Sequence, residues 1–376
     1  MSISKTYFHK PHLSIIEKVA ALDYILIFLI FSLATISFFI MYSIDGGKFD
    51  YYTKNHILRF IIFFVVFIIF SFTKIKFWHQ SSYLIYFIFL LLLIGVDFFG
   101  ITSSGSKRWL NLIIINIQPS ELMKIGLILF LARYYHNIPV YDVNRVKFLI
   151  LPIIVISVPM WLIINQPDLG TALLIAAGSV SVIYLAGLRL KYFVYIFFFS
   201  VTLIPVVISF LKPYQKLRIL TFFNPERDPL GAGYQIIQSK IAVGSGGIFG
   251  KGFLNGSQSY LDYLPEKHTD FVFTLFSEEF GFVGSSILLL IYIFIILRII
   301  SAGRNTRNAF SRLFCFGFAA AFFIYVIVNM SMVLGLLPIV GAPLPILSYG
   351  GSSMLAIMMG LGIVMSCVVH KNEILS

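Results

Sequence analysis

Charged residues are scarce in this chain. Only 12% of its 376 residues are Asp, Glu, Lys or Arg, against roughly 25% in soluble globular domains. Hydrophobic residues make up 59% of the chain, and the mean hydropathy is +0.93. This balance excludes a soluble globular protein and indicates a polytopic membrane protein, in which bilayer thickness sets the length of each element.

Cysteine is nearly absent. The two cysteines, Cys315 and Cys367, both fall inside apolar runs, which favours a packing role and gives little support to a disulfide framework or a metal site. No cleavable signal peptide is expected. Residues 1–22 are mixed and basic, and the first apolar run is long enough to remain as an anchor.

Long apolar runs are what the chain has in abundance, and each is close to the roughly 20 residues that cross a bilayer as a helix. The runs are continuous and lack the alternation of a membrane barrel, so they predict an all-α bundle. We predict ten transmembrane helices, over residues 23–43, 56–73, 82–99, 119–135, 147–164, 168–187, 191–211, 271–298, 309–336 and 345–369.

The basic residues of the tails and short loops are unevenly divided between the two sides. With the N-terminus inside, the short outer loops and their helix ends receive Lys48, Lys54, Arg59, Lys107 and Arg108, and most of the others fall inside. Basic residues concentrate on the cytoplasmic side, so this places both termini in the cytoplasm. Much of the net charge of +12 is then a topology signal, and no nucleic-acid partner is needed to explain it.

One predicted connection, residues 212–270, is far longer than the others and lies on the outer face. Loops of this length are usually functional or disordered. This one mixes aromatics, prolines, glycines and both charge signs, which predicts an ordered extracytoplasmic loop inside a single membrane domain of residues 1–376. The absence of a strong internal repeat weakens the alternative of an inverted-repeat transporter.

Two predicted helices carry ionisable residues near their starts. Glu121 and Lys124, in "QPSELMKI", stand three residues apart on one helix face. They indicate either a structural salt bridge or a polar cavity, because charges inside a membrane usually face a partner or a cavity. Asp168, in "QPDLGTALL", opens the sixth predicted helix, where it can serve as an N-cap or as a functional carboxylate.

Three further segments are less specific. Lys107 and Arg108 precede Trp109, a pattern typical of contacts with lipid headgroups. The glycine-rich stretch 231–256 could present N–H groups to an anion, but it lacks phosphate-loop spacing and fits a tightly folded loop better. The prolines and glycines of 335–353 predict irregular backbone lining a groove between the last two helices.

The stretch "LPEKHTDF" places Glu266, Lys267, His268 and Asp270 directly before the predicted helix 271–298. An ordinary interpretation is an N-cap formed by Thr269 or Asp270. No nucleophile triad and no His/Cys cluster with metal-ligand spacing is visible in the sequence. The residues leave two classes open: an enzyme acting on a membrane-borne anionic substrate, or a transporter of one.

Several of these segments, in this order, resemble the SEDS family (shape, elongation, division and sporulation proteins): "QPSELMKI", "QPDLGTALL", "DPLGAGYQIIQSKIAVGSGGIFGKGFLNGSQ", "LPEKHTDFVF", "SEEFGFVGS" and "PLPILSYGGSSML". Within the family the chain looks more like the elongation member, RodA, than the division member, FtsW. The resemblance implies ten transmembrane helices in the bacterial cytoplasmic membrane. It also implies a peptidoglycan glycosyltransferase that polymerises lipid II with inversion and releases undecaprenyl pyrophosphate. A divalent cation (Mg²⁺ or Mn²⁺), the elongation machinery and a class B penicillin-binding protein that acts as transpeptidase are implied as cofactor and partners.

The resemblance also assigns roles to residues. The essential aspartate of the family maps to Asp270, for which we expect the role of general base. Its intramembrane Glu and Lys map to Glu121 and Lys124, and its "QPDLG" aspartate maps to Asp168. The candidates for neutralising the leaving pyrophosphate are Lys124, ranked first, then Lys107, Arg108 and Arg218.

The sequence leaves the roles of some residues and several rival functions undecided. Glu278 and Glu279 receive no chemistry, and we expect them to serve structure or partner contact. The rival functions are a lipid II flippase, an FtsW-like division protein with the same chemistry, and a scaffold that only recruits the transpeptidase.

Overall fold

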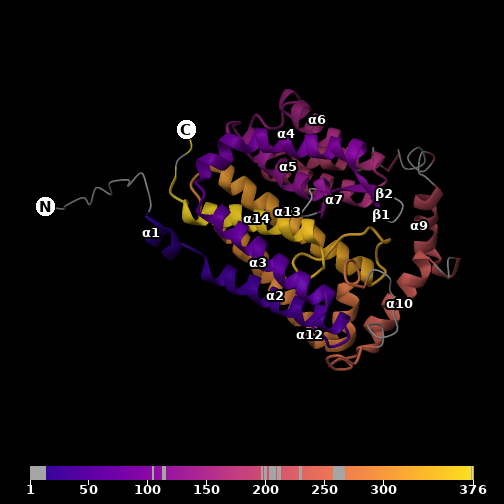
Figure 1. Cartoon of the computed structure of the whole chain (residues 1–376). Helices are drawn as coiled ribbons and strands as arrows, with labels where there is room; N and C mark the ends of the chain where they lie inside the picture. The colour runs from indigo at the N-terminus through magenta and orange to yellow at the C-terminus, as the bar shows by residue number, and fades with distance from the viewer. Residues whose placement is uncertain are drawn as a thin grey trace.

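The computed structural model describes residues 14–103, 106–111, 116–195, 198, 201–202, 209, 213–227, 231–256, 267–373 and 375. They form a bundle of long helices (Figure 1). The helices are α1 (Ile15–Ala20), α2 (Tyr24–Ile44), α3 (Tyr51–Phe72), α4 (Ile75–Phe99), α5 (Pro119–His136), α6 (Lys147–Asn165), α7 (Leu169–Leu185), α9 (Pro213–Phe223), α10 (Ala232–Ser245), α12 (Val272–Arg304), α13 (Ala309–Val333) and α14 (Gly351–Val369).

Among the described residues, seven helices are long and apolar enough to cross a membrane: α2, α3, α4, α6, α12, α13 and α14. The shorter α7 is also apolar. Helix α5 has 18 residues but carries Glu121, Lys124 and Arg133. The predicted all-α polytopic architecture is therefore confirmed in outline. The predicted helix 191–211 falls largely outside the described residues.

Several predicted boundaries are wrong. The predicted helix 345–369 begins only at Gly351, because residues 345–350 form turns. The predicted helix 271–298 continues to Arg304, and its backbone leaves helical geometry at Gly281, where φ is 64° and ψ is −161°. Helices α3 and α4 start earlier than predicted, at Tyr51 and Ile75, because their first turns carry polar residues that an apolar window excludes.

A small antiparallel sheet, which the sequence did not predict, joins α4 to α5. Strand β2 (Ser106–Asn111) lies between β1 (Ile101–Ser103) and β3 (Asn116–Ile117). Trp109 stands opposite Ile101, and Leu110 stands opposite Ile117. The pairing satisfies the backbone of a segment too short and too polar to continue either helix.

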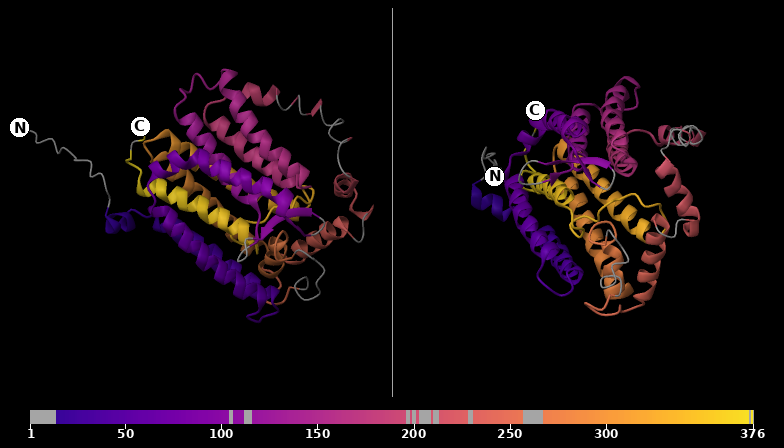
Figure 2. Two further views of the ribbon diagram at one scale, coloured as in Figure 1. Left: turned by 45° about the horizontal axis from the view of Figure 1, so that its top comes forward. Right: turned by 45° about the vertical axis from the view of Figure 1, so that its right-hand side comes forward.

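Helix α14 forms the centre of the bundle (Figure 2). Of its apolar window 78% is buried, against 22% for α4, whose outer face is therefore left for lipid. Small residues allow the close packing: a Cβ on Gly360 would lie 2.1 Å from the Phe318 ring, and one on Gly362 would lie 2.7 Å from Phe70 Cβ.

The two ends of the bundle differ. At one end, α1 and the end of α14 lie together (Figure 1), and an ion pair of 2.7 Å joins Asp23 to Arg298. The opposite end, which we call the sheet end, carries the sheet, α9, α10 and the start of α12. Residues 213–245 of the predicted loop thus contain two helices and a 3-10 turn (Pro225–Arg227). Residues 257–266, including Glu266, lie outside the described residues.

Candidate functional site

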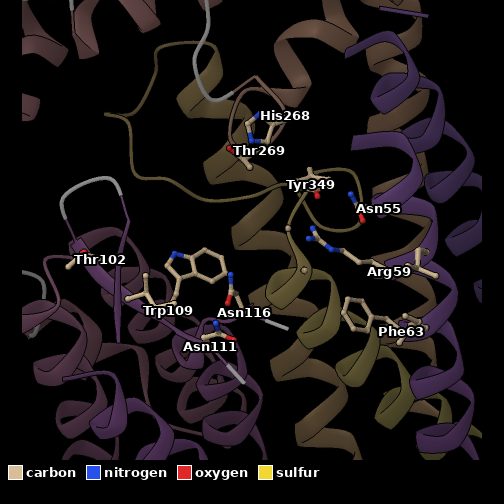
Figure 3. Close-up of a pocket in the computed structure, with 15 residues that line it drawn as sticks. Asn55, Arg59, Phe63, Thr102, Trp109, Asn111, Asn116, His268, Thr269 and Tyr349 are labelled. Atoms are coloured by element: carbon tan, nitrogen blue, oxygen red, sulfur yellow. The ribbon is translucent and has the colours of Figure 1, made fainter. Parts of the chain in front are cut away.

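A cavity of about 820 Å³ opens at the sheet end (Figure 3). One wall is α3 and another is the sheet, while residues 268–269 and 349–351 close the third side. The polar and aromatic side chains of its lining come from separate elements; they are Asn55, Arg59, Phe63, Thr102, Trp109, Asn111, Asn116, His268, Thr269 and Tyr349. The lining therefore combines a guanidinium with amide, hydroxyl and aromatic groups.

Arg59 supplies a positive charge to this cavity. Its guanidinium carbon lies 4.4 Å from the centroid of the Tyr349 ring, a stacking geometry that favours a cation. Burial raises the pKa of Tyr349 to about 12, so its phenol stays neutral. The sequence assigned Arg59 only a role in topology. The missed signal was its place within the predicted helix 56–73, because a charge in a membrane helix needs a partner or a cavity.

Asp270 directly follows His268 and Thr269, which line the cavity; it lies two residues before α12 and is half-buried. The backbone around it is fixed on both sides. The main-chain oxygen of Asp270 accepts a hydrogen bond from Asn329 Nδ2 (2.9 Å), that of Thr269 accepts one from Ser348 Oγ (2.6 Å), and that of His268 accepts one from Tyr349 N (2.8 Å). The N-cap of α12 is Phe271, without a side-chain cap, so the N-cap interpretation of Thr269 or Asp270 is wrong.

Glu121 and Lys124 meet as a buried ion pair, with 2.5 Å between Lys124 Nζ and Glu121 Oε2. Lys124 Nζ also lies 3.7 Å from the centroid of the Tyr325 ring. Their residues are 3% and 9% exposed, and neither is part of the cavity lining described above. The pair is buried, and a low dielectric strengthens its attraction.

Asp168 and Arg108 join the sheet to α7. Asp168 caps the helix by accepting a hydrogen bond from Thr171 N (3.1 Å), as one of its two interpretations expected. Its other oxygen lies 3.4 Å from Arg108 Nη1, and Arg108 Nη2 donates to the carbonyl of Pro167 (2.5 Å). Lys107 Nζ donates to the carbonyl of Asp97 (2.6 Å). The described contacts of Lys107 and Arg108 are therefore with oxygen atoms of the protein itself.

One irregular segment, residues 340–341, contacts both the start of α7 and Asp270. A Cβ on Gly170 would lie 2.4 Å from the Val340 carbonyl, so the start of α7 abuts Val340. The next residue, Gly341, has φ of 76°, and a Cβ there would lie 3.4 Å from Asp270 Oδ2. Residues 340–341 therefore contact both the start of α7, which Asp168 caps, and the carboxylate of Asp270. Arg218 is in α9, but its side chain lies outside the described residues.

Metal-binding groups are sparse in the part of the chain that the structure describes. No group of three or more His, Cys, Asp or Glu side chains is arranged there to hold an ion. Mg²⁺ is often held by one or two carboxylates together with substrate phosphates. A single carboxylate such as Asp270 fits that pattern.

The family model for the cell cycle proteins FtsW, RodA and SpoVE matches residues 20–373. The chain belongs to this family. The peptidoglycan glycosyltransferase MrdB of Escherichia coli is 44% identical over 291 residues, covering 77% of this chain and 78% of MrdB. This FtsW/RodA/SpoVE-family chain, with its apolar spans, is a multi-pass protein of the inner membrane.

Solved structures agree with this assignment. A chain from the structure "Structural coordination of polymerization and crosslinking by a peptidoglycan synthase complex" has a TM-score of 0.82 at 30% identity, covering 94% of this chain and 99% of its own length. The rod shape determining protein RodA of Thermus thermophilus has a TM-score of 0.70 at 28% identity, covering 94% of this chain and 97% of RodA. The family member described here therefore has a RodA-like fold.

Proposed function

We propose that this protein is a peptidoglycan glycosyltransferase that polymerises lipid II on the outer face of the cytoplasmic membrane during cell elongation. The observation that carries the proposal is that Asp270 directly follows His268 and Thr269, which line the cavity together with Arg59. A carboxylate and a cation at one opening suit a reaction that removes a proton and releases an anion. The similarity to MrdB and RodA supports the elongation role over division.

In the proposed reaction, the 4-hydroxyl of one saccharide attacks the anomeric carbon of another. The new C–O bond forms as the bond to undecaprenyl pyrophosphate breaks from the opposite face, which inverts the configuration. Asp270 accepts the hydroxyl proton as the bond forms, a contribution of roughly 10²–10⁴-fold in rate. The pyrophosphate leaves with the electron pair of the broken bond.

The leaving pyrophosphate needs positive charge nearby. Arg59 is the cation that lines the cavity, and its planar guanidinium suits phosphate oxygens. Lys124 is buried, paired with Glu121 and not among the lining residues, so its contribution acts through space or through a substrate-induced rearrangement. Lys107 and Arg108 would hold the sheet wall through their carbonyl contacts. Arg218 remains a proposed contact.

The proposed topology has ten transmembrane helices and both termini in the cytoplasm. Its support is the concentration of basic residues at the end of the bundle that holds α1 and the end of α14, among them Lys18, Lys74, Arg304, Arg307 and Lys371. The sheet end would then face outward, with residues 212–270 as the extracytoplasmic loop. This orientation brings the cavity to the leaflet in which lipid II presents its sugars.

A divalent cation and a partner complete the proposal. Mg²⁺ or Mn²⁺ would help to neutralise the pyrophosphate as it leaves, and Asp270 is the carboxylate best placed to contribute to holding it. A class B penicillin-binding protein would crosslink the new glycan. The structural similarity to a chain of a peptidoglycan synthase complex supports such a partner.

The test is a polymerisation assay with purified protein, lipid II and no other glycosyltransferase, read on a gel. We expect glycan from the parent protein and from Asp50→Asn, a matched change at an exposed position of the same end. Asp270→Asn should lose at least about 10²-fold in rate, because the amide cannot accept the proton.

Retained polymerisation by Asp270→Asn would refute the general base. A parent protein that moves lipid II across vesicles but makes no glycan would be a flippase. Normal growth of cells carrying only Asp270→Asn would favour the scaffold.

A further inference from the structure

The break in α12 at Gly281 removes two helical hydrogen bonds, and a distant segment replaces them. In a continuous helix, Phe282 N and Val283 N would donate to the carbonyls of Glu278 and Glu279. Here those carbonyls accept from Lys251 N (3.0 Å) and Gly252 N (3.1 Å). Phe282 N and Val283 N donate instead to the carbonyls of Gly247 (2.9 Å) and Ile248 (3.0 Å).

The glycine-rich segment 246–252 therefore fills the gap with its own backbone. Only glycine allows the approach. A Cβ on Gly246 would lie 2.1 Å from the Ser277 carbonyl oxygen, and one on Gly250 would lie 2.1 Å from that of Glu279. A Cβ on Gly281 would lie 2.3 Å from Gly250 N. Because the segment's amides bond helix carbonyls, this geometry favours the tightly folded loop over the anion cradle that the glycines also suggested.

A side-chain ion pair reinforces the backbone contacts. Lys251 Nζ lies 2.6 Å from Glu278 Oε1; Glu278 is fully buried, and the lysine side chain is 33% exposed. Next to it, Glu279 Oε1 accepts a hydrogen bond from Ser43 Oγ at the end of α2. A Cβ on Gly256 would lie 3.3 Å from a carboxylate oxygen of each glutamate, so the chain passes directly over both.

The consequence concerns Asp270. The break separates the short helical part Val272–Phe280 from the long part that follows, so the long part cannot by itself fix the direction of the short one. Hydrogen bonds from Asn329, Ser348 and Tyr349 hold the chain just before the short part, and the glycine-rich segment and the Lys251–Glu278 pair hold its other end. Asp270 lies two residues before the short part.

We infer that Lys251 and Glu278 are positioning residues for Asp270: their ion pair locks the glycine-rich segment across the break in α12 and so fixes the helical part that carries the base. This inference rests on the proposed function, because it concerns the base of that reaction. Neither residue touches the reacting atoms. A misplacement of about 1 Å can lower a rate by roughly 10²-fold, so loosening the lock lowers turnover without removing substrate contacts.

The test compares Lys251→Met, Lys251→Arg and the matched control Lys48→Met, an exposed lysine at the same end. Each is measured for kcat, for KM toward lipid II, for Tm and for hydrogen exchange. Lys251→Met should lower kcat about 10–100-fold with KM nearly unchanged. Amides of residues 272–280 should exchange faster while the rest of the bundle stays protected. Lys251→Arg should restore most of the rate, and Lys48→Met should match the parent.

A second variant guards against misfolding of the first. Glu278→Gln removes the buried charge yet still accepts a hydrogen bond, so it should give a smaller loss of kcat with the same local exchange. A uniform rise in exchange with a lower Tm in both variants would overturn the inference in favour of a general structural role. A raised KM would overturn it in favour of substrate binding, and unchanged kcat and exchange would refute it. The exchange result does not depend on activity. If Asp270→Asn still polymerises lipid II, the general-base proposal fails, but the exchange data still show whether the Lys251–Glu278 pair orders residues 272–280.

Discussion

Asn329 holds the backbone of Asp270. From its buried position on α13, its side-chain Nδ2 donates to the main-chain oxygen of Asp270 (2.9 Å) and to that of Ala342 (2.6 Å). One amide thus fixes two irregular segments, the turn before α12 and the chain between α13 and α14. Both carbonyls belong to irregular backbone, and the Asn329 side chain supplies each with a donor.

Asn329→Leu should therefore destabilise the protein and slow it. Two carbonyls lose their donor, and leaving a buried polar group unsatisfied costs about 1–3 kcal/mol. Thermal unfolding in detergent should show a lower Tm, and the polymerisation assay a lower rate. Asn305→Leu, at an exposed position near the opposite end, serves as control. An unchanged Tm for Asn329→Leu would show that other donors reach these carbonyls.

The effect of the Glu121–Lys124 pair on stability can be separated from its effect on the reaction rate. Lys124→Met leaves the Glu121 carboxylate buried and uncompensated, which should cost about 3–5 kcal/mol. The double variant Glu121→Gln/Lys124→Met removes both charges, so its Tm should return close to that of the parent. We expect its polymerisation rate to remain well below that of the parent, because the charge near the pyrophosphate is lost. A double variant with normal Tm and normal rate would show that the pair is structural alone.

His370, which follows α14, should make stability depend on pH. Burial lowers the pKa of this imidazole, and the nearby Lys18 and Lys74 lower it further. The unfolded chain, with an ordinary pKa of about 6.5, then takes up the proton first as pH falls. The contribution of neutral His370 to the free energy of unfolding is therefore fully present above pH about 6.5. It declines at lower pH until the folded protein also binds the proton. The Tm of the parent should fall more than that of His370→Asn between pH about 7.5 and about 5.5. Parallel changes in the two proteins would rule out His370 as the source.

Local pattern was enough to place many of the helices. Pro119 opens α5 and Lys147 opens α6 within a residue of their predicted positions, because an apolar run ends where polar or helix-starting residues begin. The break at Gly281 was not predictable in this way. The residues on both sides continue a helical pattern, and the groups that replace its hydrogen bonds come from some 30 positions earlier in the chain.

The candidate site shows the same division. The resemblance pointed to Asp270, Glu121, Lys124 and Asp168, but their partners could not be deduced from spacing. Lys124 lies over Tyr325, and Asp168 meets Arg108. Arg59 was passed over because its partner, Tyr349, is far away in the sequence. Such contacts depend on how helices pack, which hydropathy alone does not determine.

The sequence by itself determined the membrane environment, the helical class and the family, because a bilayer accepts only apolar segments with a satisfied backbone. Tertiary structure decided which charges neutralise one another, where the cavity opens and how the start of α12 is held. Those outcomes depend on distances of a few ångströms between segments far apart in the chain, and these distances exist only once the helices have packed.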